Sequence, residues 1–132
     1  MRIFILEDEI HKYPRNTILE VLNGHELTIT TNSFDARKFY KPSQYDLLLL
    51  DHDMRGYYDD SEYENTGYQF VKALVNIELG IVIPKPKVIL HSQNEDGRRK
   101  MGSLLAQHKF SVAEFPFGSS YVAYLKSAFG RK

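Results

Sequence analysis

The sequence predicts an α/β fold in which helices cover both faces of a five-stranded parallel sheet, as a three-layer sandwich. Short apolar segments alternate with helical patterns along the 132 residues, and this alternation is typical of repeated strand-helix units. The run YDLLLLDHD at residues 45–53 contains four consecutive leucines. A run that is apolar on both faces is typical of a central strand in a parallel sheet.

Five segments have the length and composition of strands. The second is rich in β-branched residues, the third is the four-leucine run, and Pro116 ends the fifth. We predict strands at residues 2–6, 26–31, 47–50, 85–90 and 110–115.

Five segments between and after these strands show helical spacing of apolar residues together with start and stop signals. Pro14 suits a first helical position, Ser33 and Asp96 suit N-caps, and Ser119 or Ser120 suits the last N-cap. We predict helices from Pro14 to Asn23-Gly24, over 33–40, from Gly67 to near Gly80, from Asp96 to about His108, and from Ser119 to Phe129.

At this size the flavodoxin-like strand order 2-1-3-4-5 is the leading choice, and its ligand crevice lies where the order reverses, between strands 1 and 3. This order places Glu7 and Asp8, which follow the first strand, beside Asp51 and Asp53, which follow the third. His91 and Ser92 follow the fourth strand and border the same crevice.

The composition excludes several classes of function. There is no cysteine, so disulfides, thiolate metal sites and a cysteine nucleophile are ruled out. Lys plus Arg equals Asp plus Glu at 17 each, so no net charge indicates a membrane or double-stranded nucleic acid as partner. No apolar run has transmembrane length and no export signal is visible, so we expect a cytoplasmic protein.

These residues together resemble the receiver domain of two-component signalling, over nearly the whole chain. Receivers carry an acidic pair after strand 1, here Glu7-Asp8, and a phospho-accepting aspartate after strand 3, here Asp51. The resemblance implies a single receiver-like domain over residues 1–132. Two positions depart from the pattern: His91 occupies the hydroxyl position, and Phe115 stands where receivers have lysine.

A narrower resemblance rests on short motifs at the ends of the strands. These motifs are Asp51-His52-Asp53, the run His91-Ser92-x-Asn94-x-x-Gly97-x-x-x-Met101, and Pro116-Phe117. They are similar to the group described as cyclic-phosphate-processing receiver-like domains. The resemblance implies a phosphoesterase acting on a cyclic phosphate of a nucleotide, an ADP-ribose-type molecule or an RNA end. An atypical stand-alone receiver phosphorylated on Asp51 and a degenerate binding module remain open as alternatives.

The carboxylates are the candidate metal ligands. Hard divalent cations prefer carboxylate oxygens, so we expect Mg²⁺, with Mn²⁺ as an alternative, at Glu7, Asp8, Asp51 and Asp53. Asp51 is also a candidate nucleophile. The alternative is that the acids after the first strand are ordinary solvated loop residues.

Two histidines supply what a hydrolase needs for proton transfer, because imidazole titrates near neutral pH. We assign His91 as general acid or base, and His52 as a metal ligand or second acid. Since side chains alternate along a strand, Asp51 and Asp53 can share one direction while His52 points the opposite way, into the packing.

Polar residues after the fourth strand are candidates for binding a phosphate. Ser92 and Asn94 offer hydrogen bonds, and Arg98 offers a guanidinium, although an arginine at this point of a helix often only faces solvent. His11 and Arg15 are weaker candidates.

The stretch 54–66 is too long for a simple strand-to-helix loop. Its residues Tyr57, Tyr58 and Tyr63 can form a lid that stacks on a base, or a partner surface. As partners we expect a small phosphorylated substrate or a phosphodonor, with a homodimer left open.

Overall fold

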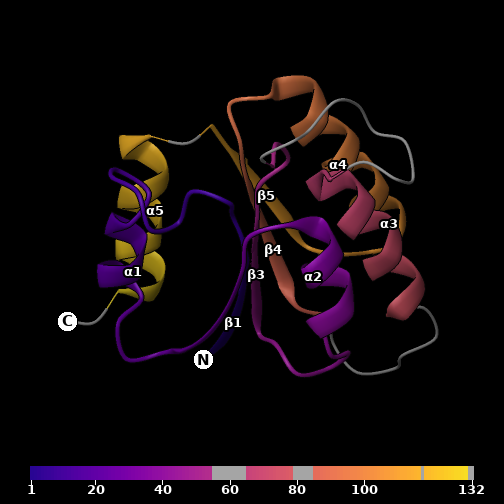
Figure 1. Cartoon of the computed structure of the whole chain (residues 1–132), viewed down its shortest axis with the longest axis horizontal. Coiled ribbons are helices and arrows are strands. Elements are labelled where there is room, and N and C mark those ends of the chain that lie inside the picture. The colour runs from indigo at the N-terminus through magenta and orange to yellow at the C-terminus, as the bar shows by residue number, and fades with distance from the viewer. Residues whose placement is uncertain (55–64, 79–84, 117, 131–132) are drawn as a thin grey trace.

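A computed structural model of the chain describes residues 1–54, 65–78, 85–116 and 118–130. Strands and helices alternate along the chain from the first strand to the last helix (Figure 1). The elements are β1 (Arg2–Leu6), α1 (Thr17–Val21), β2 (Glu26–Thr30), α2 (Ser33–Phe39), β3 (Leu47–Leu50), α3 (Gly67–Ile77), β4 (Lys87–His91), α4 (Glu95–Gln107), β5 (Val112–Phe115) and α5 (Ser119–Phe129).

The five strands form one parallel sheet of order β2-β1-β3-β4-β5. Helices α1 and α5 cover one face, and α2, α3 and α4 cover the other (Figure 1). The predicted fold class and strand order are confirmed. All five carboxyl ends therefore meet at one edge of the sheet, where such folds bind their ligands.

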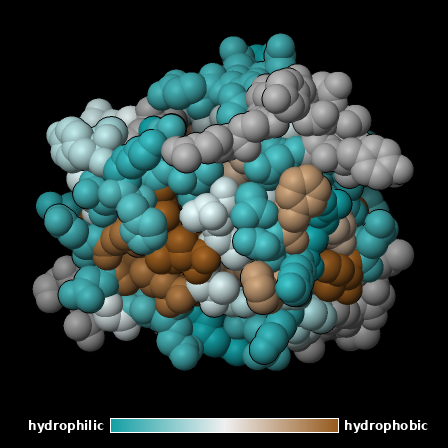
Figure 2. Space-filling model, viewed as in Figure 1, coloured by the Kyte–Doolittle hydropathy of each residue, from teal (hydrophilic) through white to brown (hydrophobic). Residues whose placement is uncertain are grey.

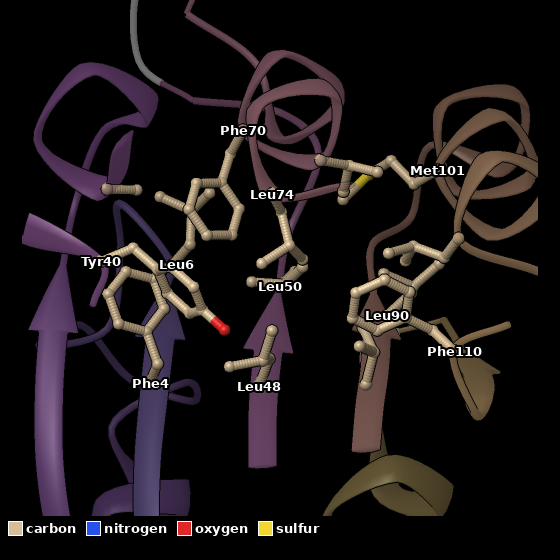
Figure 3. Close-up of a cluster of buried hydrophobic side chains, with 14 of the residues drawn as sticks. Phe4, Leu6, Tyr40, Leu48, Leu50, Phe70, Leu74, Leu90, Met101 and Phe110 are labelled. Atoms are coloured by element: carbon tan, nitrogen blue, oxygen red, sulfur yellow. The ribbon is translucent and has the colours of Figure 1, made fainter. Parts of the chain in front are cut away.

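The four leucines of β3 pack against the helices on both faces of the sheet. Leu48 and Leu50 belong to the hydrophobic cluster under α2, α3 and α4, which Figure 3 shows with Phe4 and Phe70. Leu47 and Leu49 belong to the cluster under α1 and α5. All four are completely buried, which stabilises the fold by about 2 kcal/mol for each side chain.

The cluster under α1 and α5 is less completely covered than the one in Figure 3. Leu19 and Val21 of the α1 region, and Leu27 and Ile29 of the edge strand β2, are only partly buried against it. Figure 2 shows a largely hydrophilic surface with a hydrophobic area on the side where α1 lies. Among the described residues, no helix is long and apolar enough to cross a membrane.

Two predicted N-caps lie one or two residues away from the observed ones. Asn32, and not Ser33, caps α2, because its side chain accepts the Asp35 N–H. Asn94, and not Asp96, caps α4, because its side chain accepts the Gly97 N–H. In both cases an asparagine, which is an equally good cap, stands just before the predicted residue.

Three other boundaries differ for reasons of backbone hydrogen bonding. The residues after Pro14 form turns with bonds to the third residue back, so α1 begins only at Thr17. Pro86 has no N–H to donate, and β4 begins after it. The Phe110 N–H bonds to the Leu105 carbonyl at the end of α4, so β5 begins later than predicted.

Candidate metal and phosphate site

Three polar residues stand side by side at the carboxyl edge of the sheet. Leu6, Leu50 and Leu90 are paired in register across β1, β3 and β4, and the residues that follow them are Glu7, Asp51 and His91. Backbone bonds extend the pairing, since the Asp51 N–H donates to the Leu6 carbonyl. Because side chains alternate along a strand, these three share the face of the sheet that α1 and α5 cover.

A cavity of about 320 Å³ opens at this edge. It is built from the ends of β1, β3 and β4 and from the loop after β1. Its described lining residues are Glu7, Asp8, Glu9, Arg15, Asp51, Asp53, Met54, Ser92 and Gln93. The predicted crevice between the first and third strands is therefore present as a cavity.

Glu7, Asp8 and Asp51 each offer a carboxylate oxygen, and these oxygens lie within 4.8 Å of one another. Glu7 is fully buried and Asp51 is 5% exposed. Burial, and then the charge of Glu7, raise the pKa of Asp51 well above its usual range. Burial likewise raises the pKa of Glu7, although Asp51 and Arg15 oppose this change.

Like charges held this closely and away from water destabilise each other unless a proton or a cation intervenes. The donor atoms are all hard oxygens, which suit Mg²⁺ or Mn²⁺. The group therefore fits a divalent metal. Within the described part of the chain, Asp53 stands outside this three-carboxylate group, although it lines the same cavity.

Arg15 brings a positive charge into the cavity. Its Nε forms an ion pair with Oε1 of Glu7, and the other oxygen of Glu7 accepts the Glu9 N–H at 3.2 Å. Phe115, at the position where receivers have lysine, instead packs its ring on Tyr124. Arg15 was only a weak candidate in the sequence, because the turn after β1 is what brings it back to Glu7. Its position in the loop after a strand was the one feature of the sequence that suggested it.

His91 lies behind the cavity and not in it. The side chain is fully buried, is not among the described lining residues, and stacks on Tyr121 with ring centroids 4.9 Å apart. Its Nδ1 is 4.0 Å from Oε1 of Glu7, and neither ring nitrogen has a hydrogen-bond partner among the described residues.

This environment keeps the His91 ring neutral. Burial lowers the pKa of His91 to about 3; the Arg15 guanidinium adds to the lowering, and the Leu49 backbone opposes it. At neutral pH the ring is therefore an uncharged group behind the Glu7 carboxylate.

His52 points to the other face of the sheet, as alternation along the strand allows. It is 1% exposed, and its ring fills the space beside Gly97, where a Cβ would come within 2.4 Å of the ring. Its Nδ1 lies 2.6 Å from Oδ1 of Asp53. Because a carboxylate only accepts hydrogen bonds, Nδ1 carries the proton and donates to Asp53.

Asp53 is thus held from two sides while its side chain remains 48% exposed. Nδ2 of Asn94 donates to Oδ1 of Asp53 at 2.9 Å, while the Asn94 oxygen caps α4. The Ser92 hydroxyl lines the cavity and accepts the Asn94 N–H at 3.1 Å. The polar run after β4 therefore orients the Asp53 carboxylate through Asn94 and adds Ser92 to the lining of the cavity.

Arg98 is placed elsewhere. Its Nη1 donates to the Ser92 carbonyl, and its Nε lies 3.5 Å from Glu114. It is not among the described residues that line the cavity, so in this structure it holds α4 to the strand ends. Tyr57, Tyr58 and Tyr63, which the sequence suggested as a lid, lie outside the described residues.

Several solved structures with the same fold are receiver domains or response regulators. The HemR receiver of Leptospira biflexa is 13% identical, with a TM-score of 0.63, over 99% of this chain and 97% of that one. The receiver of a Pseudomonas aeruginosa sensor histidine kinase, with magnesium coordinated in its active-site cleft, is 18% identical, with a TM-score of 0.57, over 97% and 95%. The Thermotoga maritima regulator TrrA, in complex with Mg²⁺-BeF, is 22% identical, with a TM-score of 0.59, over 96% and 93%.

These likenesses define the fold as that of a receiver. No curated protein matches the chain. The family described as the cyclic-phosphate processing receiver domain matches residues 2–107, and the chain belongs to this family. The resemblance inferred from the motifs at the strand ends is thereby confirmed.

Proposed function

We propose that this protein is a metal-dependent phosphoesterase that opens cyclic phosphates on nucleotides, ADP-ribose-type molecules or RNA ends. One observation carries the proposal: the cavity contains a group of three carboxylates that fits a metal and, separate from it, the carboxylate of Asp53, which His52 and Asn94 orient. The description of the family as processing cyclic phosphates supports the same reaction.

Glu7, Asp8 and Asp51 would hold Mg²⁺, or Mn²⁺ in its place. A bound metal of this kind stabilises charge on the phosphate and lowers the pKa of a coordinated water. In the protein without metal, burial raises the pKa of both Asp51 and Glu7, and the charge of Glu7 raises the pKa of Asp51 further; a bound cation would offset this cost.

In the hydrolysis, a water oxygen forms a bond to phosphorus and one of the two ring P–O bonds breaks. Asp53 accepts the proton that the water loses, since its carboxylate faces the cavity and is already oriented by two donors. The departing sugar oxygen takes a proton from solvent in the open cavity. The product is a phosphomonoester.

The remaining residues bind or orient. Arg15 and the Ser92 hydroxyl, both of which line the cavity, bind phosphate oxygens. His52 acts through Asp53, and His91 acts through Glu7, because neither ring is among the described residues that line the cavity. We therefore assign both histidines as positioning residues, in place of the direct proton transfer that the sequence suggested.

The test combines turnover with metal binding. Turnover of 2′,3′-cyclic nucleotides and of 1″,2″-cyclic phosphates is measured with Mg²⁺, with Mn²⁺ and with EDTA, and Mn²⁺ binding is followed by electron paramagnetic resonance. Asp51→Asn should lose both turnover and Mn²⁺ binding. Asp53→Asn should lose at least about 100-fold in kcat, as expected for an acid–base group, while it still binds Mn²⁺.

Glu95→Gln is the matched control, because Glu95 is exposed on α4 and pairs only with Arg99 among the contacts described; it should behave as the parent does. Absence of turnover with every metal and substrate, or equal turnover by parent and Asp51→Asn, would contradict the proposal.

The second candidate is an atypical receiver that accepts a phosphoryl group on Asp51. The placement of Asp51 in an acidic cavity favours it, and TrrA, a neighbour in fold, is in complex with Mg²⁺-BeF. Beryllofluoride with Mg²⁺ should then shift the NMR spectrum of the parent and not of Asp51→Asn. A protein that neither turns over substrate nor traps beryllofluoride would be a binding module.

A further inference from the structure

A second hollow lies next to the acidic cavity, and we call it the outer groove. Its volume is about 530 Å³, larger than the acidic cavity. Tyr13 and Pro14 of the loop after β1 form one wall, and Ser119 and Val122 at the start of α5 contribute to the other.

The two hollows share two lining residues, Arg15 and Gln93. The outer groove therefore adjoins the acidic cavity, and Arg15, whose guanidinium pairs with Glu7, lines both. A ligand that extends past Arg15 from a phosphate in the acidic cavity would enter the outer groove.

The walls differ in chemistry from the acidic cavity. Carboxylates dominate the acidic cavity, whereas none lines the outer groove among the described residues. Tyr13 is 83% exposed, and it lines the groove together with the aliphatic side chains of Pro14 and Val122. An exposed aromatic ring in a groove with aliphatic walls is suited to stacking on a planar base.

We propose that the outer groove binds the nucleobase of a nucleoside phosphate whose phosphate group occupies the acidic cavity, with Tyr13 stacking on the base. This inference rests on the proposed function for the position of the phosphate. It narrows the substrate class to cyclic phosphates of nucleosides and of nucleoside-terminated RNA, in preference to those of simple sugars or glycerol. The volume of the groove lies in the range of small-molecule sites.

The test compares ligands with and without a base. Binding of 3′-AMP and of glycerol 2-phosphate is measured by NMR titration with saturating Mg²⁺, on the parent, Tyr13→Ala and Tyr13→Phe. Tyr13→Ala should lower the affinity for 3′-AMP at least about fivefold, which is the lower end of the contribution of one base–aromatic stack. Its affinity for glycerol 2-phosphate should stay the same. Tyr13→Phe keeps the ring and should bind 3′-AMP as the parent does.

Phe39→Ala is the control, because Phe39 is a half-exposed aromatic residue of α2, on the opposite face of the sheet. This variant should bind both ligands as the parent does. With cyclic substrates, Tyr13→Ala should raise KM for 2′,3′-cyclic AMP and leave kcat unchanged, while both constants for glycerol 1,2-cyclic phosphate stay the same.

The inference is overturned if the parent binds 3′-AMP no better than glycerol 2-phosphate, or if Tyr13→Ala weakens both ligands equally. The two proposals fail in distinguishable ways. A Tyr13-dependent preference for 3′-AMP without turnover would keep the groove and remove the phosphoesterase, whereas turnover that ignores the base would keep the phosphoesterase and remove the groove.

Discussion

Two buried glutamates, at opposite edges of the sheet, have different surroundings. Glu7 follows β1 at the carboxyl edge, where two other carboxylates and Arg15 surround it. Glu78 follows α3 at the amino edge and is 1% exposed. It accepts the Tyr40 hydroxyl at 2.6 Å and, more weakly, the Ser43 N–H at 3.4 Å.

The difference shows that burial of a carboxylate does not by itself indicate a functional site. Glu78 is satisfied by neutral donors, as a buried acid in a structural role should be. Glu7 is held beside like charge, which the fold tolerates only at a cost. Protons and divalent cations should therefore change the stability of the carboxyl edge and leave the amino edge unaffected.

The largest expected effect is the change in the free energy of unfolding with pH that His91 causes at the carboxyl edge. The folded ring stays neutral down to about pH 3, whereas an unfolded histidine takes up a proton below about pH 6.5. Between these values the unfolded state binds more protons, so His91 makes stability fall as pH falls, by about 3 kcal/mol from pH 7 to pH 4. Glu7 and Asp51, whose pKa values are raised, act in the opposite direction.

Urea unfolding in EDTA at pH 7, 5.5 and 4 isolates the His91 contribution as the difference between the parent and His91→Gln. The parent should lose its advantage over the variant as pH falls. His11→Gln, at an exposed histidine, is the control. Parallel pH curves for the parent and His91→Gln would show that the ring is not held neutral by burial.

The second effect is the increase in the free energy of unfolding when Mg²⁺ binds. A ligand that binds only the folded state, at 100 times its Kd, raises the free energy of unfolding by about 2.7 kcal/mol. We expect this increment for the parent and for Glu78→Gln, and none for Asp51→Asn. Urea unfolding with Mg²⁺ and with EDTA measures it, and a full increment in Asp51→Asn would place the metal elsewhere.

The third effect tests the amino edge alone. Tyr40→Phe removes the hydroxyl that donates to the buried Glu78 and should lower the free energy of unfolding by about 2 kcal/mol, as for a hydrogen bond to a charged group. The Mg²⁺ increment should not change. Tyr13→Phe, at an exposed tyrosine, should have almost no effect on stability. A reduced Mg²⁺ increment in Tyr40→Phe would show that the two edges are coupled.

The smallest effect is the change in the free energy of unfolding when one acid at each edge is made neutral, and its sign differs between the two edges. In EDTA, Asp51→Asn removes a charge beside buried Glu7 and should raise the free energy of unfolding by about 1 kcal/mol. Glu78→Gln weakens the bond from Tyr40 and should lower it by a similar amount. Urea unfolding at pH 7.5 measures both changes. If both variants were destabilised, repulsion at the carboxyl edge would not be a significant term.

Much of this molecule could be predicted from patterns along the chain. The four leucines of β3 pack on both faces of the sheet, which is why the parallel sheet was predictable, and the flavodoxin-like arrangement common at this size supplied its order. Acids that directly follow apolar strands must lie at the carboxyl edge, so Glu7, Asp8 and Asp51 were predictable as one group.

Other features depended on packing between distant segments. From the sequence, the side chain of His52 could point to either face of the sheet. In the structure its ring packs in the space beside Gly97 of α4, away from the cavity. Tyr121 of α5 similarly stacks on His91 behind Glu7. Strand-end spacing identified both residues and carried no information on whether their rings reach the cavity.

The sequence by itself therefore determined the parallel sheet and the carboxylates at its carboxyl edge, because these follow from local apolar runs and from the residues next to them. Only the tertiary structure decided that Arg15 enters the cavity, that the two histidines stand behind carboxylates, and that Tyr13 lines a groove shared with α5. These features depend on contacts between segments far apart in the chain, which no pattern of neighbouring residues encodes.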